Sequence, residues 1–502
     1  MSPTTATTRE VRAAGSGEVL GRIESLRPEQ ITSLVTSARQ AQRDWAAAAP
    51  HHRADALVAA SQELGDHVEP LARAHARESG KILPQATHEV RGAVALLRRN
   101  AELARMAGGE VAPTGAFPGG EQDLTIVERV PLGVVVAVLP FNFPIELAME
   151  KAAAALAVGN AAIVKLPPQN PLATAAALEI VGRHLPEGVL QVVDADNETA
   201  GALCAAPGVD AVSLTGSVGA GLAVARATAE QLRPLHLELG GNGAAIVRRD
   251  ADLDHVVSET LRGRLLMNGQ ACAATKRVIA HREVAAELTE RLVAALSDVV
   301  PGDPLDPASR LGPLIDARAA GHVEQQVQSA VAEGARRALG HAPDGAWFAP
   351  TVLADVPPEA ALLHDDEIFG PVVPVVAVDD DEAAVELANS TRLRLTAAVF
   401  SADLAAALAV AQRLDVGGVV VNGTNNYRPP VVPFGGVDLA GAGREGLGWT
   451  LGELTRTRFI ALRGIRPAGI PPRPPTTAPT TGPTAGSTTD LNGTTCSTSP
   501  IA

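Results

Sequence analysis

The chain has 502 residues, which exceeds the size at which a single hydrophobic core stops growing, so we expect two or more domains. Apolar residues make up 46% and charged residues 20% of the chain, which is close to average globular composition. The formal net charge is −14, and the sequence contains no sustained run of Lys and Arg. These features argue against nucleic acid and anionic membrane surfaces as partners and indicate a small-molecule ligand.

The start of the chain and its cysteines limit its compartment and its chemistry. The segment Met1–Leu20 contains no apolar core, and no stretch approaches the ~20 apolar residues that span a bilayer, so we predict a cytoplasmic protein. The three cysteines, Cys204, Cys272 and Cys496, are too few and too scattered for a disulfide framework or a metal cluster. We therefore predict no metal site, and a functional cysteine would act as a lone thiol.

The first part of the chain is predicted to be mostly helical. From about Arg22 to Met106, Ala, Leu and Val recur at three- and four-residue spacing between Arg, Glu and Gln. Residues Leu124–Val130 then alternate apolar and polar side chains, as an exposed strand does, whereas Gly133–Leu139 is continuously apolar, as a buried strand is. A layer of helices is thus expected to precede the first strands of a sheet.

A regular alternation of helices and strands is predicted next. Helices are expected after Pro144, after Pro171 and from Val218, and strands at Ala161–Leu166, Val189–Val193, Val212–Leu214 and Leu235–Leu239. Such an alternation favours right-handed crossovers and a parallel sheet with helices on both faces. Ligands bind these sheets beyond the carboxyl ends of the strands, where Lys165 and Gly216 fall.

The rest of the chain divides into a second α/β segment and a tail. Residues from Ala244 to about Gly436 again mix helical and strand patterns, including the apolar strand Val372–Val378, and we interpret them as a separate catalytic domain. After Gly464 the sequence consists mainly of Pro, Thr, Ser and Gly, which cannot bury enough apolar surface to offset the entropy of ordering. Residues 465–502 are therefore predicted to be a disordered tail.

Three segments carry side chains suited to covalent catalysis. Cys272 lies between small residues in Met267-Asn-Gly-Gln-Ala-Cys-Ala-Ala-Thr-Lys276, which leaves room for a carbonyl group to approach the thiol. Glu238 lies in an apolar strand that ends with two glycines, and desolvation there would raise its pKa, which suits a general base. Asn142 lies between the prolines of Leu139-Pro-Phe-Asn-Phe-Pro144, and its amide can donate to a developing oxyanion.

Seven motifs in this order resemble the aldehyde dehydrogenase superfamily over nearly all of residues 20–464. They are Pro140-Phe-Asn-Phe-Pro144, Gly159-Asn160 through Lys165, Leu214-Thr-Gly-Ser217 with Gly221, Glu238-Leu-Gly-Gly241, Gly269-Gln-Ala-Cys272, Glu367-Ile-Phe-Gly-Pro371 and Pro433-Phe-Gly-Gly436. Such a set is far more specific than any one Gly-rich loop. The resemblance implies the α/β aldehyde dehydrogenase fold, with a Rossmann-like parallel-sheet cofactor domain, an α/β catalytic domain and a small oligomerisation hairpin.

The resemblance also implies domain boundaries and an oligomer. The NAD(P)-binding domain would comprise residues 1–108 and 132–240, the catalytic domain residues 241–451, and the oligomerisation strands residues 109–131 and 452–464. Family members are dimers or tetramers in which such a hairpin extends the sheet of a neighbouring subunit and covers its edge. We therefore expect a homodimer or a homotetramer.

Roles for individual residues follow from the same resemblance. Cys272 would attack the aldehyde, the Asn142 side chain and the Cys272 backbone N–H would hold the oxyanion, and Glu238 would activate the water that hydrolyses the thioester. Lys165 would hold the adenosine ribose, Glu367 the nicotinamide ribose and Phe369 the nicotinamide ring. Gly216 and Ser217 would begin the helix that faces the pyrophosphate. The remaining residues expected around the cofactor are Leu139, Pro140, Phe141, Pro168, Gly221 and Leu239.

Cofactor preference stays open at the sequence level. In NAD-preferring members an acidic residue commonly follows the ribose-binding lysine by three positions, and here Pro168 stands there. The cofactor is therefore predicted to be NAD or NADP. Asp438 and Ala440 stand where the family often has Lys and Ser after Pro-Phe-Gly-Gly, and this departure concerns local contacts and not the chemistry.

Two arginines bear on the substrate. Arg98 and Arg428 resemble positions that bind the anionic end of the substrate in the lactaldehyde, non-phosphorylating glyceraldehyde-phosphate and phosphonoacetaldehyde dehydrogenase branches. Arg98 is equally compatible with a solvated helix face beside Arg99, and Ala271 stands where the phosphate and phosphonate branches often have a third arginine. Our hypothesis is a small aliphatic aldehyde, hydroxylated or anionic, and a bulky aromatic aldehyde is the alternative.

Two other functions compete with hydrolytic aldehyde oxidation. A CoA-acylating enzyme of the same fold would pass the thioester to CoA, but such enzymes typically lack the general-base glutamate that Glu238 supplies here. A catalytically silent relative would keep the fold without turnover, and intact Cys272, Asn142 and Glu238 argue against it. Reactivity of the thiol distinguishes the silent relative from an enzyme.

Overall fold

A computed structural model describes residues 8–465 of the chain. Cys496 and all but the first residue of the predicted disordered tail lie outside the described residues. The described chain divides into two compact units, residues 8–108 with 128–458 and residues 109–127 with 459–465. No helix within the described residues is long and apolar enough to cross a membrane.

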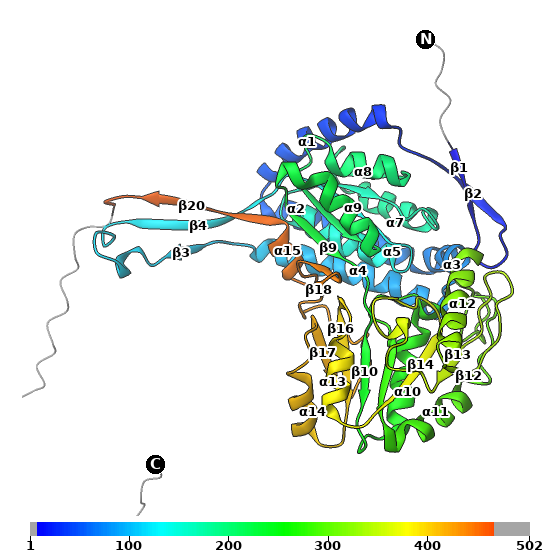
Figure 1. Cartoon of the computed structure of the whole chain (residues 1–502). Helices are drawn as coiled ribbons and strands as arrows, with labels where there is room; N and C mark the ends of the chain where they lie inside the picture. The colour runs from blue at the N-terminus through cyan, green and yellow to red at the C-terminus, as the bar shows by residue number, and fades with distance from the viewer. Residues whose placement is uncertain (1–7, 466–502) are drawn as a thin grey trace, which may run out of the picture. The chain divides into compact units, whose positions relative to one another are not determined.

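The first unit, whose helices and strands are drawn in Figure 1, contains a six-stranded sheet with the order β19-β9-β8-β5-β6-β7. Its strands are β5 (Val134–Val138), β6 (Ala161–Lys165), β7 (Leu190–Val193), β8 (Ala211–Thr215), β9 (Leu235–Glu238) and β19 (Gly441–Ala442). The five long strands pair in parallel, as the alternation with helices predicted, and β19 joins antiparallel to β9. The sheet of the first half of the chain thus includes β19, a short strand about 200 residues after β9 in the sequence.

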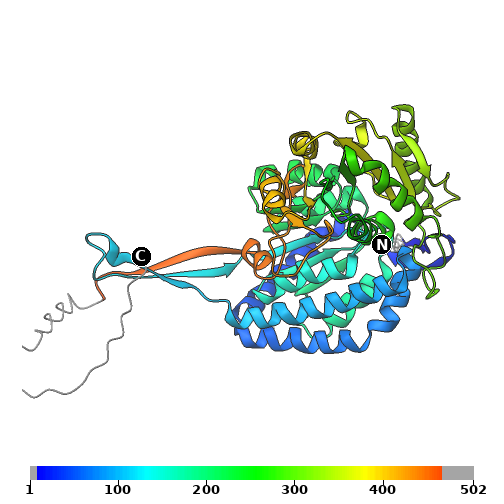
Figure 2. The same cartoon turned by 90° about the horizontal axis from the view of Figure 1, so that it is seen from below.

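Helices cover both faces of this sheet because successive strand residues point to opposite sides. Val134 and Val136 pack with α1 (Ile31–Ala47), α8 (Asn197–Ala205) and α9 (Val218–Thr228), whereas Val135 and Ala137 pack on the other face. That face is covered by α2 (Pro50–Asp66), α3 (Val68–Ser79), α4 (Leu83–Met106), α5 (Pro144–Ala148), α6 (Ala154–Ala157) and α7 (Leu172–Gly182). In Figure 2, α2 and α4 lie side by side.

The N-terminal region differs from the predicted start of the helical layer. Thr8–Arg12 (β1) and Val19–Glu24 (β2) form an antiparallel pair, and the first α-helix begins at Ile31. The helical pattern expected from about Arg22 is therefore wrong for its first residues. The partly exposed β2 carries alternating side chains that the longer helical periodicity obscured.

A seven-stranded sheet with the order β12-β13-β14-β11-β10-β16-β17 forms the second half of the first unit. The strands are β10 (Ala244–Val247), β11 (Arg277–His281), β12 (Arg336–Leu339), β13 (Thr351–Ala354), β14 (Val372–Val378), β16 (Thr396–Phe400) and β17 (Gly418–Val421). One face packs against α10 (Leu253–Leu265) and α11 (Arg282–Leu296), the other against α12 (Ala317–Ala332), α13 (Asp381–Asn389) and α14 (Leu404–Ala411). This sheet carries the α/β pattern predicted for residues 244–436.

β15 (Leu393–Arg394) pairs antiparallel with β18 (Val437–Asp438), and a separate three-stranded sheet has the order β20-β4-β3. Its members are β3 (Glu110–Ala112), β4 (Leu124–Pro131) and β20 (Thr455–Leu462), and β3 pairs antiparallel with β4. Within the second unit, Asp123 accepts hydrogen bonds from the Arg463 side chain and the Gly464 N–H. The strands expected at residues 124–130 and within residues 452–464 are present, and their use in an oligomer stays a prediction.

Candidate active site

A cavity of about 760 Å³ in the first unit brings most of the predicted site together. The predicted residues that line it are Leu139, Pro140, Phe141, Asn142, Lys165, Pro168, Gly216, Ser217, Glu238, Leu239, Cys272, Glu367, Phe369 and Arg428. They come from the carboxyl ends of β5, β6, β8 and β9, from the loop after α10 and from the loops around 367 and 428. The cavity therefore lies where ligands bind parallel sheets.

Two predicted residues lie outside the lining of this cavity. Gly221 is buried in α9, where a Cβ would come within 2.6 Å of a methyl carbon of Leu239, so its role is close packing behind the lining. Arg98 points to solvent from α4, with a side chain 69% exposed and a hydrogen bond of 3.3 Å to Glu102. The surface-helix interpretation of Arg98 fits this placement.

The loop that carries Cys272 has a constrained backbone. Met267, Asn268 and Gly269 all have positive φ, at 49°, 57° and 81°, and such conformations persist when the surroundings hold them in place. The fully buried Asn268 donates to the carbonyl oxygens of Gly80 at 2.9 Å and Pro313 at 2.8 Å and accepts from the Gly312 N–H at 2.8 Å. Asn268 thus fixes the loop by satisfying backbone groups from two distant segments.

Asn142 is held on the same loop. Its Nδ2 donates to the Gln270 carbonyl oxygen at 3.0 Å, two residues before Cys272, and the Gln270 side chain accepts from the Ile315 N–H at 3.0 Å. From behind, Lys81 donates to the Asn142 carbonyl oxygen at 2.7 Å. Hydrogen bonds therefore hold both the side-chain amide and the backbone carbonyl of Asn142.

The Lys81 ammonium belongs to a buried polar cluster that the sequence did not indicate. Lys81 pairs with Glu89, which also binds His75 Nε2 at 2.8 Å and accepts from the Ile145 N–H at 3.0 Å. Lys81 and His75 act on the Glu89 carboxylate to lower its pKa to about 2, although burial alone would raise it. A charged Glu89 thus holds the first turn of α5, directly after the Asn142 motif.

Cys272 and Glu238 meet inside the cavity. The thiol donates to Glu238 Oε2 at 3.8 Å, and Glu238 Oε1 is buried with no hydrogen-bond partner among the described residues. Burial, followed by the charge of Glu238, raises the pKa of the Cys272 thiol well above its usual value. Burial, followed by the charge of Glu445, raises the pKa of Glu238 to about 8. Both groups are therefore predominantly neutral at pH 7 in the ligand-free protein.

A chain of buried charges lies behind Glu238. The fully buried Glu445 accepts from Lys151 Nζ at 2.6 Å and from the Arg428 guanidinium at 2.8 Å, and both cations lower the pKa of Glu445. Lys151 also donates to Ser213 at 3.2 Å. The guanidinium carbon of Arg428 lies 3.9 Å from the centre of the Phe434 ring. Arg428 is thus an anchored cation and not a mobile surface group.

The part of the cavity lined by Gly216, Ser217 and Glu367 has groups that suit a dinucleotide. Ser217 caps α9 by accepting from the Ala220 N–H at 3.2 Å, which leaves the helix N-terminus at the cavity wall, and the Thr215 hydroxyl is buried without a partner among the described residues. A Cβ on Gly240 would lie 2.5 Å from Glu367 Oε2, so residue 240 has no room for a side chain. Lys276 pairs with Glu367 at 3.0 Å. The donors suit phosphate oxygens and ribose hydroxyls.

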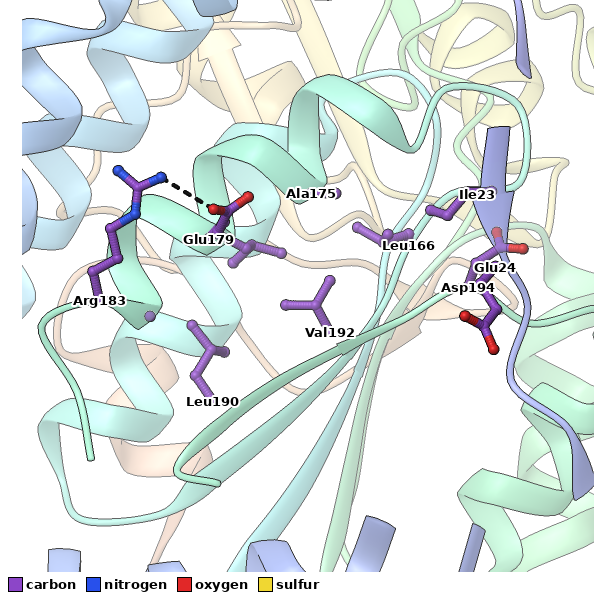
Figure 3. Close-up of a pocket in the computed structure, with 11 residues that line it drawn as sticks. Ile23, Glu24, Leu166, Ala175, Glu179, Arg183, Leu190, Val192 and Asp194 are labelled. Carbon is purple, nitrogen blue, oxygen red and sulfur yellow. Dashed lines mark hydrogen bonds and ion pairs between the residues drawn. The ribbon is translucent and has the colours of Figure 1, made fainter. Parts of the chain in front are cut away.

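A second hollow, of about 530 Å³, lies beside the edge strand β7 (Figure 3). Ile23, Leu166, Leu190 and Val192 give it an apolar wall, and Arg183 pairs with Glu179 at its rim. It shares no residue with the predicted site. The catalytic side chains named above therefore gather in the cavity around Cys272 alone.

Several cavity residues escaped the sequence analysis. His88, Glu146, Glu150, Arg262 and His322 line the cavity, but they lie in helical patterns with charged residues on several sides, which do not show which side meets a cavity. Glu146 and Glu150 stand four residues apart after Asn142, and this spacing is a signal that they share one helix face. Lys81, Glu89 and Glu445 gave no such signal. Lys81 lies before α4 and pairs with Glu89 inside it, eight positions away, and Glu445 pairs with Lys151 across 294 positions.

The amino-acid sequence was compared with known protein families and individual proteins. The sequence profile of the aldehyde dehydrogenase family matches residues 1–460. The chain is 35% identical to benzaldehyde dehydrogenase [NAD(+)] of Pseudomonas putida, covering 89% of this chain and 91% of the relative. It is 34% identical to an aldehyde-dehydrogenase-like protein of Sinorhizobium fredii, covering 90% and 88%.

A solved structure agrees with the sequence relatives. NADP-dependent glyceraldehyde-3-phosphate dehydrogenase from Bacillus halodurans, complexed with NADP, superposes with a TM-score of 0.88 at 32% identity, covering 91% of this chain and 96% of that chain. The expected fold is thereby confirmed. The chain belongs to the aldehyde dehydrogenase family.

Proposed function

We propose that this protein oxidises an aldehyde to its carboxylic acid with NAD or NADP, using Cys272 as the covalent nucleophile. The observation that carries the proposal is the meeting of the Cys272 thiol with the Glu238 carboxyl at 3.8 Å in a cavity that the Asn142 amide also lines. A nucleophile beside a base and an amide donor is the arrangement that acyl-transfer chemistry needs.

The steps follow from the protonation states of these groups. The ionised fraction of Glu238, about one tenth at pH 7, accepts the thiol proton as Cys272 Sγ adds to the aldehyde carbon, and the negative charge passes to the adduct oxygen. The oxyanion then receives hydrogen bonds from Asn142 Nδ2 and the Cys272 N–H. A bound nicotinamide cofactor would accept hydride from the thiohemiacetal carbon, leaving a thioester on Cys272. Once Glu238 has released the thiol proton to solvent, it takes a proton from a water molecule, and the resulting hydroxide displaces Cys272 as a thiolate. Glu238 then returns its proton to the Cys272 thiolate as the acid leaves.

The cofactor would occupy the part of the cavity beyond Cys272. We assign the phosphates to the N-terminus of α9 with Gly216 and Ser217, the adenosine ribose to Lys165, and the nicotinamide ribose and ring to Glu367 and Phe369. The relatives support either cofactor, since one is named for NAD and another binds NADP. Pro168 carries no charge that would repel a 2′-phosphate.

We assign the six-stranded-sheet region, residues 1–108 and 132–240, to cofactor binding and residues 241–451 to the catalytic domain. The strands within 109–131 and 452–464 would supply the contacts of a homodimer or homotetramer. For the substrate, we propose a small aliphatic aldehyde that is hydroxylated or anionic, with Arg428 as its polar anchor. An aromatic aldehyde is the alternative, and the name of the Pseudomonas relative keeps it in the test.

The proposal is tested by absorbance at 340 nm with NAD and NADP in parallel and a panel of aliphatic, hydroxy-, amino-, carboxy-, phospho- and aromatic aldehydes. Cys272→Ser is the control, and it should abolish the signal. Turnover that needs added CoA would instead identify the CoA-acylating reaction. Silence with every aldehyde, with and without CoA, would refute the proposal and favour a catalytically silent relative.

A further inference from the structure

One carboxyl in the wall of the Cys272 cavity has no part in the reaction described above. Glu146 lies in α5, four residues after Asn142, and lines the cavity together with Glu150 and Arg428. Glu89 and Arg428 act on it through their charges, and no hydrogen bond to its carboxyl contributes. Glu146 is thus an ionisable group at the cavity wall whose oxygens no described residue engages.

A missing side chain on the neighbouring helix makes room for this carboxyl. On α4, His88 and Leu96 line the cavity, and Gly92 lies between them at four-residue spacing on the same helix face. A Cβ on Gly92 would come within 3.0 Å of Glu146 Oε1 and 3.2 Å of its Cδ. The carboxyl therefore occupies a notch that exists because residue 92 has no side chain.

The other acidic groups near Glu146 are already engaged. Glu89 binds Lys81 and His75, and Glu150 accepts hydrogen bonds from the Gly446 N–H at 2.9 Å and from the Thr450 hydroxyl. Burial, followed by the charge of Glu89, raises the pKa of Glu146 to about 7. Glu146 thus retains free acceptor capacity beside the Asn142 motif, as the general base Glu238 does beside Cys272.

The cations near the reacting end are equally engaged. Arg428 shares Glu445 with Lys151, and Arg262 pairs with Glu259 at 3.3 Å. An anionic substrate group would have to compete with the buried Glu445 for Arg428, and it would also be repelled by Glu146 and Glu150. A hydrogen-bond donor would find an open acceptor instead. The charge balance around Cys272 therefore favours donors over anions.

On the basis of the proposed function, we infer that Glu146 is a specificity-determining residue that accepts a hydrogen bond from a donor group on the aldehyde. The donor is a hydroxyl or an ammonium group carried beyond the carbonyl carbon. The enzyme then prefers hydroxy- or amino-aldehydes to carboxy- and phospho-aldehydes and to unsubstituted alkyl aldehydes of the same length. Of the hydroxylated and anionic aldehydes proposed above, this inference keeps the hydroxylated ones, and it adds amino-aldehydes to the proposed substrates.

The test compares kcat/KM for aldehydes of matched length that end in hydroxyl, ammonium, carboxylate or methyl groups. Wild-type protein should favour the two donor-bearing aldehydes. Glu146→Leu should reduce that preference over the methyl-terminated aldehyde by about tenfold to a hundredfold, as expected for a lost hydrogen bond to a carboxylate. Glu146→Gln should keep the preference for hydroxyl and lose that for ammonium, which separates the two donors.

Two further variants control for folding and for surface charge. Gly92→Ala should reduce the same preference by displacing the carboxyl from its notch while residue 146 stays glutamate. Glu69→Gln, which removes an exposed carboxylate on α3, should change no ratio. A wild-type preference for carboxylate, or ratios unchanged by both Glu146→Leu and Gly92→Ala, would overturn the inference and leave the proposed function standing. Absence of turnover with every aldehyde would overturn both.

Discussion

Replacing Glu238 by glutamine separates the two halves of the proposed reaction. Glutamine keeps the size of the side chain but cannot take a proton from water, so hydrolysis of the thioester should slow by about 10²–10⁴, the range of general-base catalysis. The pKa of Glu238 is raised to about 8, so about one tenth of the wild-type carboxyl is ionised at pH 7. The loss should therefore be about 10–10³ at pH 7 and approach the full range near pH 9.

Stopped-flow absorbance at 340 nm measures this directly. Glu238→Gln should give a slower burst that still approaches one reduced cofactor per active site, because solvent can take the thiol proton in its place. A slow steady state should follow, because hydrolysis has lost its base. Wild-type steady-state turnover should rise with pH through about 8 as Glu238 ionises, and the variant should lose this rise. A variant that keeps the wild-type steady-state rate and pH profile would refute the assignment of Glu238 to hydrolysis.

Three further predictions concern the support of the site. Gly269→Ala should destabilise the protein by about 1–3 kcal/mol, since φ is +81° and the added Cβ would lie 2.3 Å from the Gly370 carbonyl. Gly321→Ala, where the Cβ would meet no other atom within 4 Å, should not destabilise it, and thermal denaturation of both variants measures the difference. Glu89→Gln should cost about 3–5 kcal/mol by stranding buried Lys81, and chemical denaturation should show partial recovery when Lys81→Met is added. Lys165→Met should raise the KM for the cofactor by roughly tenfold and leave the KM for the aldehyde within about twofold, measured by initial rates.

The side chains that the sequence identified share a local signature. Glu238 ends an apolar strand, Asn142 lies between prolines, and Cys272 lies among small residues, so each stood out from its own neighbours in the chain. The parallel sheet could be predicted from the alternation of strands and helices, and its strands could be recognised because burial on both faces makes parallel strands continuously apolar. Local patterns of this kind need no knowledge of which distant segments meet.

The supporting charges could not be predicted in the same way. Lys151 and Glu445 are 294 positions apart, and Lys81 meets Asn142 across 61 positions. Each looks like a solvated residue when only its neighbours in the chain are considered. On α4 the rotation of about 100° per residue turns Arg98 to solvent while Leu96 faces the cavity. A helix pattern with charged residues on several sides does not specify which side meets a cavity.

These buried charges explain why the resting site can be neutral at its centre. Around Cys272, the fixed ions are matched, Glu89 with Lys81 and Glu445 with Lys151 and Arg428. Cys272 and Glu238 are left to share the transferable proton. The raised pKa of the thiol keeps Cys272 protonated until substrate arrives, and the ionised fraction of Glu238 then accepts that proton. Proton transfer then moves one negative charge at a time, first from Glu238 to the adduct oxygen and later from Glu238 to the attacking water. Fixed dipoles stabilise each charge without reorganising, which is why a site of this kind must be anchored by residues far from the chemistry.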